Sequence, residues 1–177
     1  MPTPNLAFRR ATVDDLPAAH ELFATARAFM AEAGNPTQWA GGYPQDEILR
    51  DDIANNGFWI VFDAEDLDEK EPLAVFFFDT VDDDETYRKI DGAWLNDETF
   101  GVVHRIATHR GTHGIGTACI KWAEQQAAVR GAKGGIRIDT HEDNTPMRSL
   151  LAKLGYTYTG IIWTYDGTPR VAYQKLV

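Results

Sequence analysis

The stretch from Val102 to Thr117 constrains the fold of this chain more than any other part. An aliphatic and β-branched run ends at Thr108 in a short, basic, glycine-rich turn, and an amphipathic helical pattern begins directly after that turn. A strand–turn–helix junction of this kind directs backbone N–H groups and the positive end of a helix dipole at one small volume. Glycines in the turn can adopt φ > 0 and let a ligand approach the backbone closely. The junction therefore predicts an anion site, best suited to a phosphate or pyrophosphate.

Two common phosphate-binding patterns match this turn only in part. The segment from Gly111 to Gly116 has the first spacing of a P-loop, but Thr117 stands where that motif needs its lysine. Gly114 and Gly116 begin the dinucleotide pattern G-x-G-x-x-G/A, but Cys119 occupies its third position. The strand before the turn also lies late in the chain instead of opening a βαβ unit. Neither pattern is complete.

A third pattern fits the spacing better. The turn resembles the acetyl-CoA loop of the GNAT superfamily of N-acetyltransferases, which reads roughly [QR]-x-x-G-x-[GA] after a hydrophobic strand. Gly114 and Gly116 match its two small residues, and the basic residue stands one place early, at Arg110, with Gly111 at the usual position. The resemblance implies that acetyl-CoA is held by Ile106, Ala107, Thr108, Arg110, Gly111, Thr112, His113, Gly114, Ile115, Gly116, Thr117 and Asn144.

A second segment supports the same resemblance. Residues 144–156 resemble the GNAT signature N-x-x-A-x-x-[LF]-Y-x-K-x-G-F, and the matching positions are Asn144, Leu150, Lys153, Gly155 and Tyr156. The segment also reads as a helix on physical grounds, because Pro146 suits a first helical turn and Gly155 suits a left-handed end. The two signatures cover about residues 102–156, and the last strands extend the resemblance to the C-terminus.

One position departs from the family pattern. Leu151 stands where many relatives have a tyrosine thought to protonate the leaving CoA thiolate. Leucine donates no proton, so the general acid must be another group, a water, or absent. Tyr165 and Tyr173 of the C-terminal hairpin are the candidates, and we expect Tyr173 as the acid. The departure leaves open an alternative function, a CoA-binding sensor or structural module with impaired catalysis.

Acetyl transfer to an amine needs a base for the ammonium, a donor for the thioester carbonyl and aligned reactants. His104 alternates with Val102 and Ile106 along one strand face, and a histidine suits the base because imidazole titrates near neutrality. Its alternative is a core histidine bonded to the sheet. Asp139, on the next strand, is expected to pair with Arg137.

Other catalytic chemistries find little support in the sequence. The chain's one serine, Ser149, lies in a helical pattern without a nucleophile elbow, and its one cysteine, Cys119, falls on the buried face of a helix. His109 and His113 are four residues apart but sit in a turn and lack the H-E-x-x-H glutamate, so we expect no metal.

Length and composition limit the class of protein. The 177 residues suit one domain, residues 1–177, and 44% hydrophobic with 25% charged residues is ordinary for a globular chain. A net charge of −10 argues against nucleic acid as a partner and mildly favours a small cationic amine. No run is long enough to span a membrane, and Met1 to Pro4 begin no secretory signal. A single cysteine fits a cytoplasmic location. Dimers are common in the family, although no feature here specifies an interface.

The order of expected elements predicts an α+β fold with a mixed sheet and helices on both faces. The resemblance implies a GNAT-like three-layer arrangement in which the sheet splays between the strands near 102–108 and 135–141. An aromatic loop at 38–44 reads as a lid, and the acidic run 81–85 reads as a solvated connection. Strands are expected at 6–10, 58–62, 73–80, 101–108, 135–141, 156–165 and 170–176, and helices at 12–32, 46–54, 115–130 and 144–154.

Overall fold

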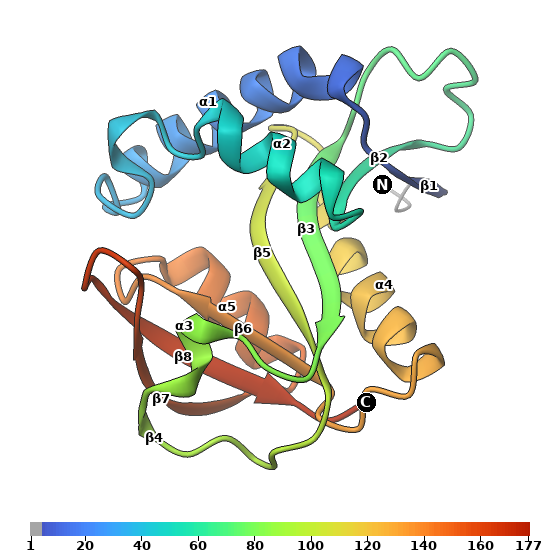
Figure 1. Ribbon diagram of the computed structural model, residues 1–177. Helices are drawn as coiled ribbons and strands as arrows, with labels where there is room; N and C mark the ends of the chain where they lie inside the picture. Colours follow the sequence, from blue (N-terminus) through green and yellow to red (C-terminus); the bar gives the residue numbers. More distant parts are fainter. Residues whose placement is uncertain (1–4) are drawn as a thin grey trace.

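The computed structural model describes residues 5–177 and contains one mixed sheet with helices on both faces (Figure 1). Residues 1–4, on which the expectation of no secretory signal rests, lie outside this range. The strands are β1 (Leu6–Arg10), β2 (Phe58–Asp63), β3 (Ala74–Val81), β4 (Ile90–Gly92), β5 (Phe100–Thr108), β6 (Ile136–Thr140), β7 (Thr157–Trp163) and β8 (Pro169–Lys175). The helices are α1 (Leu16–Glu32), α2 (Asp46–Ala54), α3 (Glu85–Arg88), α4 (Ile115–Val129) and α5 (Thr145–Lys153), with 3-10 turns at Val13–Asp15 and Ala40–Gly42.

The sheet has eight strands in the order β1-β2-β3-β5-β6-β8-β7-β4. Every neighbouring pair is antiparallel except β5 and β6, which are parallel and joined through α4. Their pairing is confined to Gly101 with Ile136 and Val102 with Arg137. Beyond these positions the two strands diverge, as Figure 1 shows. The predicted splay near 102–108 and 135–141 is therefore confirmed, together with the mixed α+β fold.

Alternation along the strands sends side chains to two separate cores. On one face Phe58 and Ile60 of β2 pack with Phe23 of α1 and Leu49 of α2. On the other face the core includes residues of α4 and α5, with Val61, Phe76, Cys119, Ile120 and Leu151 among its buried members. Burial raises the pKa of the Cys119 thiol to about 12, so this cysteine is a packed core residue and no nucleophile.

The acidic run 81–85 is a solvated connection only in part, because Asp84 caps the short helix α3 by accepting a hydrogen bond from the Thr86 N–H at 2.9 Å. The helix carries Tyr87, which is 2% exposed, into a small third core. After α3 the chain adds β4 to the sheet edge beside β7. Neither element has a periodic pattern long enough to be recognised in the sequence.

Candidate functional site

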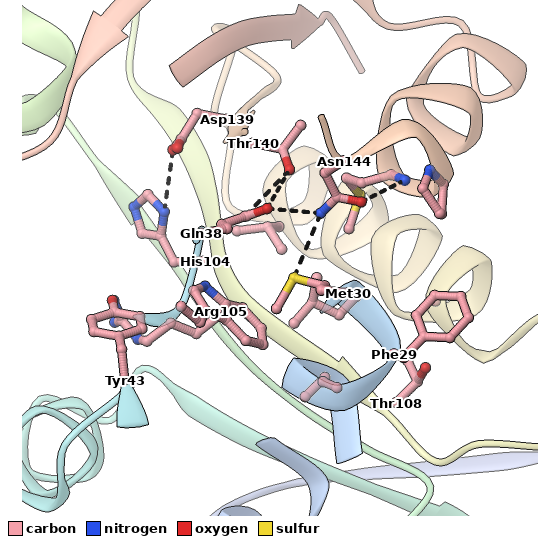
Figure 2. A pocket seen from close by; sticks show the side chains of 18 of the residues that line it. Phe29, Met30, Gln38, Tyr43, His104, Arg105, Thr108, Asp139, Thr140 and Asn144 are labelled. Atoms are coloured by element: carbon pink, nitrogen blue, oxygen red, sulfur yellow. Dashed lines mark hydrogen bonds and ion pairs between the residues drawn. The ribbon is translucent and has the colours of Figure 1, made fainter. Parts of the chain in front are cut away.

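The diverging strands border a cleft of about 720 Å³. Its walls come from β5, β6, α1, the segment 37–45, the glycine turn after β5, the start of α5 and the tip of the β7–β8 hairpin. Figure 2 shows side chains of β5 and β6 facing one another across it. The cleft is therefore the place where the parallel pair opens, with the glycine turn at one end.

A bulge in β5 shapes the middle of the cleft. His104 faces Phe77 and Ala107 faces Val75, so Arg105 and Ile106 together oppose one residue of β3. Arg105 has φ 53°, a left-handed conformation that costs a non-glycine residue roughly 1–2 kcal/mol. Such a bulge leaves backbone polar groups without sheet partners. These groups lie along the cleft, where they can hold a carbonyl or an amide of a bound ligand.

The side chain at the bulge ties the sheet to its first helical layer. The Arg105 guanidinium donates to both carboxylate oxygens of Asp52 in α2, at 2.9 and 2.7 Å, and to the Tyr43 hydroxyl at 3.2 Å. Burial is the largest influence on Asp52 and raises its pKa, although Arg105 acts in the opposite direction. The ion pair fixes α2 and the end of the segment 37–45 against the cleft.

His104 lines the cleft and lies between two carboxylates. Its Nε2 is 3.6 Å from Asp84 Oδ2, and its Nδ1 is 3.8 Å from Asp139 Oδ1. Phe77 stacks against the ring at 5.9 Å, and the His104 side chain keeps 21% of its surface exposed. Figure 2 shows the line between His104 and Asp139 crossing the gap between β5 and β6. The imidazole therefore has one carboxylate on each side of its ring.

Tyr87 orients the carboxylate on the far strand. Its hydroxyl donates to Asp139 Oδ1 at 2.8 Å. Burial, followed by the charge of Asp139, raises the pKa of Tyr87 well above its ordinary value, so the phenol stays a neutral donor. The expected pairing of Asp139 with Arg137 is not formed: the Arg137 guanidinium stacks between Trp94 and Phe100 and donates to the Asn96 carbonyl at 2.6 Å. Sequence spacing gave no signal for the meeting of Asp84, Tyr87 and His104.

The glycine turn has the geometry of an anion cradle. Gly114 has φ 83° and is the N-cap of α4, a conformation that favours glycine. The His109 N–H is held by the Leu73 carbonyl at 2.7 Å, which fixes the start of the turn to β3. The N–H groups of the first turn of α4 have no intrahelical acceptors and point out of the helix end. Gly116 forms the nearby wall, beside Thr108 and Leu150.

Arg110, the basic residue of the turn, is paired with α1. Its guanidinium forms an ion pair with Glu32 of α1 at 2.6 Å and lies 5.8 Å from the centre of the Phe29 ring. Both charged side chains are 57% exposed, and the pair holds the pKa of Glu32 below its ordinary value. A ligand phosphate at the turn would therefore compete with Glu32 for this guanidinium.

Asn144 takes part in a polar network that the sequence did not indicate. Its Oδ1 accepts from the Met147 N–H at 3.2 Å and so caps α5, while its Nδ2 donates to Gln38 Oε1 at 2.9 Å. Gln38 also receives a hydrogen bond from Asn35 at 2.7 Å and donates to the Thr140 hydroxyl at 3.3 Å. Figure 2 shows Gln38 lying between β6 and α5. This network fastens the segment 37–45 to β6 and α5, and the Arg105–Tyr43 contact fastens it to β5.

The other expected residues divide into two groups. The expected CoA residues that line the cleft are Ile106, Ala107, Thr108, Arg110, Gly111, Thr112, His113, Gly116 and Asn144, while Gly114, Ile115 and Thr117 stand behind that lining. Of the aromatic residues before the first sheet hairpin, Trp39 and Tyr43 line the cleft, whereas Phe58 and Trp59 are core residues.

The two tyrosines considered as acids differ in their position relative to the cleft. The Tyr173 hydroxyl accepts a hydrogen bond from Arg148 at 3.2 Å, and Tyr173 is not among the cleft-lining residues. Tyr165 is at the hairpin tip, where it is 91% exposed and borders the cleft mouth. Leu151 is 0% exposed and points into the core. The helix α5 therefore turns its family tyrosine position away from the cleft in this chain.

Neither a membrane-spanning helix nor a cluster of metal-ligating side chains occurs within residues 5–177. No helix in that range combines the length and apolarity needed to cross a membrane. In the same range no three histidine, cysteine or acidic side chains gather as a metal site would require, and His109 and His113 remain in their turn.

Comparisons with known proteins find a matching family and similar structures. The model of the acetyltransferase (GNAT) family matches residues 25–156. A crystal structure of a GNAT-family acetyltransferase from Streptococcus agalactiae is similar, with 32% identity, a TM-score of 0.77 and coverage of 97% of this chain and 95% of that one. A protein from Salmonella typhimurium, solved with its cofactor acetyl-CoA, shares the fold at 14% identity, with a TM-score of 0.60 and coverage of 97% and 93%.

One curated relative is similar over a shorter region. It is a streptothricin acetyltransferase from Escherichia coli, 39% identical over 66 residues. The match spans 37% of this chain and 37% of that relative's length.

Proposed function

The chain belongs to the acetyltransferase (GNAT) family, and from that premise we propose that it transfers an acetyl group from acetyl-CoA to a primary amine. Transfer is direct, within a complex that holds both substrates. The single observation that carries the proposal is the opening of the parallel pair β5–β6 into a cleft that ends at a left-handed glycine and a helix N-terminus. This arrangement suits a long thioester with a pyrophosphate at one end.

The residues around the glycine turn fit CoA chemically. Unpaired N–H groups at the start of α4, assisted by the helix dipole, suit the pyrophosphate. His113 and Arg110 add basic side chains beside it. The backbone along the β5 bulge suits the pantetheine amides and the thioester carbonyl, because its sheet partners are missing there. Asn144 and Thr140 offer further polar side chains along the same wall.

His104 is the proposed general base. It lies in the cleft wall close to the bulge, and its carboxylate neighbours stabilise the imidazolium that proton uptake produces. Tyr173 is not carried into the proposal as the acid, since its hydroxyl is bonded to Arg148 outside the cleft lining. Departure of the thiolate is then assisted by water or by transfer of a proton from the attacking nitrogen.

The acceptor we propose is a small cationic amine. Asp139 and Asp166 present carboxylates to the cleft, and three hydrogen bonds from Thr164 and Thr168 lower the pKa of Asp166 to about 2. Trp39 and Tyr43 supply aromatic faces near the same region, which favour a cation. The name of the curated relative adds streptothricin to the amines worth testing.

A second candidate function is a CoA-binding sensor or structural module without catalysis. The buried Leu151 favours it, because the usual acid is missing and its position faces the core. Turnover separates the two functions, since both predict binding of CoA.

Thermal unfolding in the presence of acetyl-CoA, free CoA, ATP and NADH tests the binding step. A ligand at 100 times its Kd stabilises the native state by about 2.7 kcal/mol, so we expect both CoA species to raise Tm and the other two to leave it unchanged. Release of free thiol is then followed with polyamines, amino acids, peptides and streptothricin as acceptors. Stabilisation by ATP or NADH alone would contradict the CoA site, and binding without turnover on any amine would favour the sensor.

A further inference from the structure

Asp84 is the carboxylate on the side of His104 that faces away from the main cleft. Asp84 is the N-cap of α3 and is not among the residues that line the main cleft. It lines a second cleft of about 180 Å³, together with Tyr87, Trp94, Phe100 and Arg137. His104 and Asp139, in contrast, line the main cleft. The imidazole therefore stands between two solvent-reached spaces, with one carboxylate on each side.

The two carboxylates are not equivalent partners for the imidazole. The oxygen of Asp139 that approaches Nδ1 already accepts a hydrogen bond from the Tyr87 hydroxyl at 2.8 Å. Asp84 uses Oδ1 to cap α3, and its Oδ2 is the oxygen that faces His104 Nε2. A neutral imidazole carries one N–H, and Asp84 Oδ2 is the better acceptor for it.

We propose that Asp84 is a positioning residue that holds the proton of neutral His104 on Nε2, so that the Nδ1 lone pair faces the main cleft. This inference rests on the proposed function, because it assigns His104 as the base. The contact of 3.6 Å is slightly longer than a hydrogen bond. Catalytic contacts are often long in unliganded enzymes and shorten in the substrate complex.

The acceptor ammonium would then meet complementary partners. It donates one hydrogen bond to the Nδ1 lone pair and another to Asp139, the two groups that lie 3.8 Å apart at the cleft wall. Two other ionisable features lie near the ring. Asp52 and Arg105 on the α2 side form an ion pair whose charges cancel, and Tyr87 stays protonated and neutral. With the opposite tautomer an N–H would point at the ammonium, and His104 could not accept its proton.

The protons balance over the whole reaction. An ammonium and acetyl-CoA give an amide, a CoA thiol and one free proton, so two protons leave the nitrogen and one of them ends on sulfur. Nδ1 accepts the first, and the imidazolium is stabilised between Asp84 and Asp139. The imidazolium then releases its Nε2 proton to water on the Asp84 side, since bound substrates fill the main cleft. Proton exchange with water afterwards returns the neutral ring to the form protonated on Nε2. The second proton passes from the attacking nitrogen to the departing sulfur.

The test is Asp84→Asn, with Asp83→Asn as the matched control. Asparagine keeps an oxygen for the α3 cap but turns an NH₂ donor toward Nε2, which forces the ring proton onto Nδ1. Asp83 is the neighbouring carboxylate, 55% exposed and paired with Arg88, so its loss alters the same charge without touching His104. Long-range ¹H–¹⁵N spectra report the tautomer of each neutral histidine, and His104→Gln identifies the His104 signals.

We expect Nε2–H in the unaltered protein and in Asp83→Asn, and Nδ1–H in Asp84→Asn. We also expect Asp84→Asn to lower kcat about 10²- to 10⁴-fold, the usual contribution of a general base, with KM for acetyl-CoA unchanged. Retention of Nε2–H in Asp84→Asn, or an unaltered kcat, overturns the proposal. The spectra need no turnover, so they decide on Asp84 even if no amine is acetylated, a result that would instead overturn the proposed function.

Discussion

Gly116→Asp should leave the fold at least as stable and strongly weaken the proposed CoA site. Gly116 is the second residue of α4 and lines the cleft. A Cβ there would lie 3.6 Å from Leu150 Cδ2 and 3.9 Å from Thr108 Cγ2, both ordinary contacts. A carboxylate in a first helical turn stabilises the helix by about 0.3–1 kcal/mol, and removal of a helical glycine adds a similar amount. The free energy of unfolding without ligand should therefore stay level or rise.

The same carboxylate should repel the pyrophosphate. Two unit charges separated by about 4–8 Å at an effective dielectric constant near 20 repel one another by about 2–4 kcal/mol. This energy corresponds to a loss of affinity of about 30- to 1000-fold for both acetyl-CoA and free CoA. Titration calorimetry gives the two Kd values, and thermal unfolding of the unliganded protein gives the stability.

Two further variants separate charge from shape. Gly116→Ala adds the Cβ alone and should cost much less affinity than the aspartate. Ala18→Asp places the same charge in the first turn of α1, away from the cleft, and should leave both Kd values unchanged. If Gly116→Asp binds CoA within twofold of the unaltered protein, the start of α4 is not the pyrophosphate site. A large fall in stability would show instead that a side chain at position 116 does not fit beside Leu150 and Thr108.

Three other changes test how the cleft is built. Leu151→Tyr should lower the free energy of unfolding by about 1–3 kcal/mol in urea titrations, because position 151 is packed in the core. The variant should not raise kcat, and a gain in kcat would contradict that packing. Arg105→Ala leaves the buried Asp52 carboxylate without its partner and should lower the free energy of unfolding by about 3–5 kcal/mol in chemical denaturation. Adding Asp52→Asn should recover part of this loss. Equal losses in the single and double variants would refute the pairing. The pKa of Asp166 is about 2 in the native state against an ordinary 3.8, so ionised Asp166 stabilises the native state. This stabilisation is complete above pH 4 and is lost as the pH falls toward 2. Asp166→Asn should therefore flatten the dependence of Tm on pH in that window, and an unaltered profile would count against the stabilisation.

The sequence predicted the elements whose signals are local. Helix α2 runs from Asp46 to Ala54 as expected, because its apolar spacing and the Asn55-Asn56-Gly57 stop are both contained in the segment. The glycine turn is equally local, since Gly114 supplies the left-handed N-cap by itself. The splay of β5 from β6 came from the family resemblance and is confirmed by the two register pairs at the strand starts.

The arrangement around His104 could not be predicted in the same way. The bulge at Arg105 exists only relative to its partner strand β3, and the single-strand pattern contains no sign of it. Asp84 and Asp139 approach the ring from elements 55 residues apart in sequence, and α3 is too short to show a period. Alternation along one strand could place His104 on a face, but only the packing of three elements shows which charges surround it.

The buried Leu151 raises the question of whether the chain can catalyse transfer without the family acid. The ordinary pKa values of the reacting groups argue that the base matters more. A primary amine like that of lysine, with a pKa near 10.4, is free at pH 7 in only about one molecule in 2,500, which corresponds to a barrier of about 4.6 kcal/mol. A thiol with a pKa near 8.5 is already a few per cent thiolate at pH 7, so the leaving group needs less help.

His104→Gln should therefore be more damaging than the natural loss of the tyrosine. Its kcat/KM for the amine should fall about 10²- to 10⁴-fold at pH 7. Without the base, turnover depends on amine that is already free in solution, so the residual rate should climb about tenfold per pH unit from 7 to 9. CoA affinity serves as the control and should stay unchanged, since His104 lies apart from the glycine turn. A variant that keeps the unaltered rate, or whose residual rate is flat with pH, would place deprotonation of the amine on another group and return the search to the remaining side chains of the cleft.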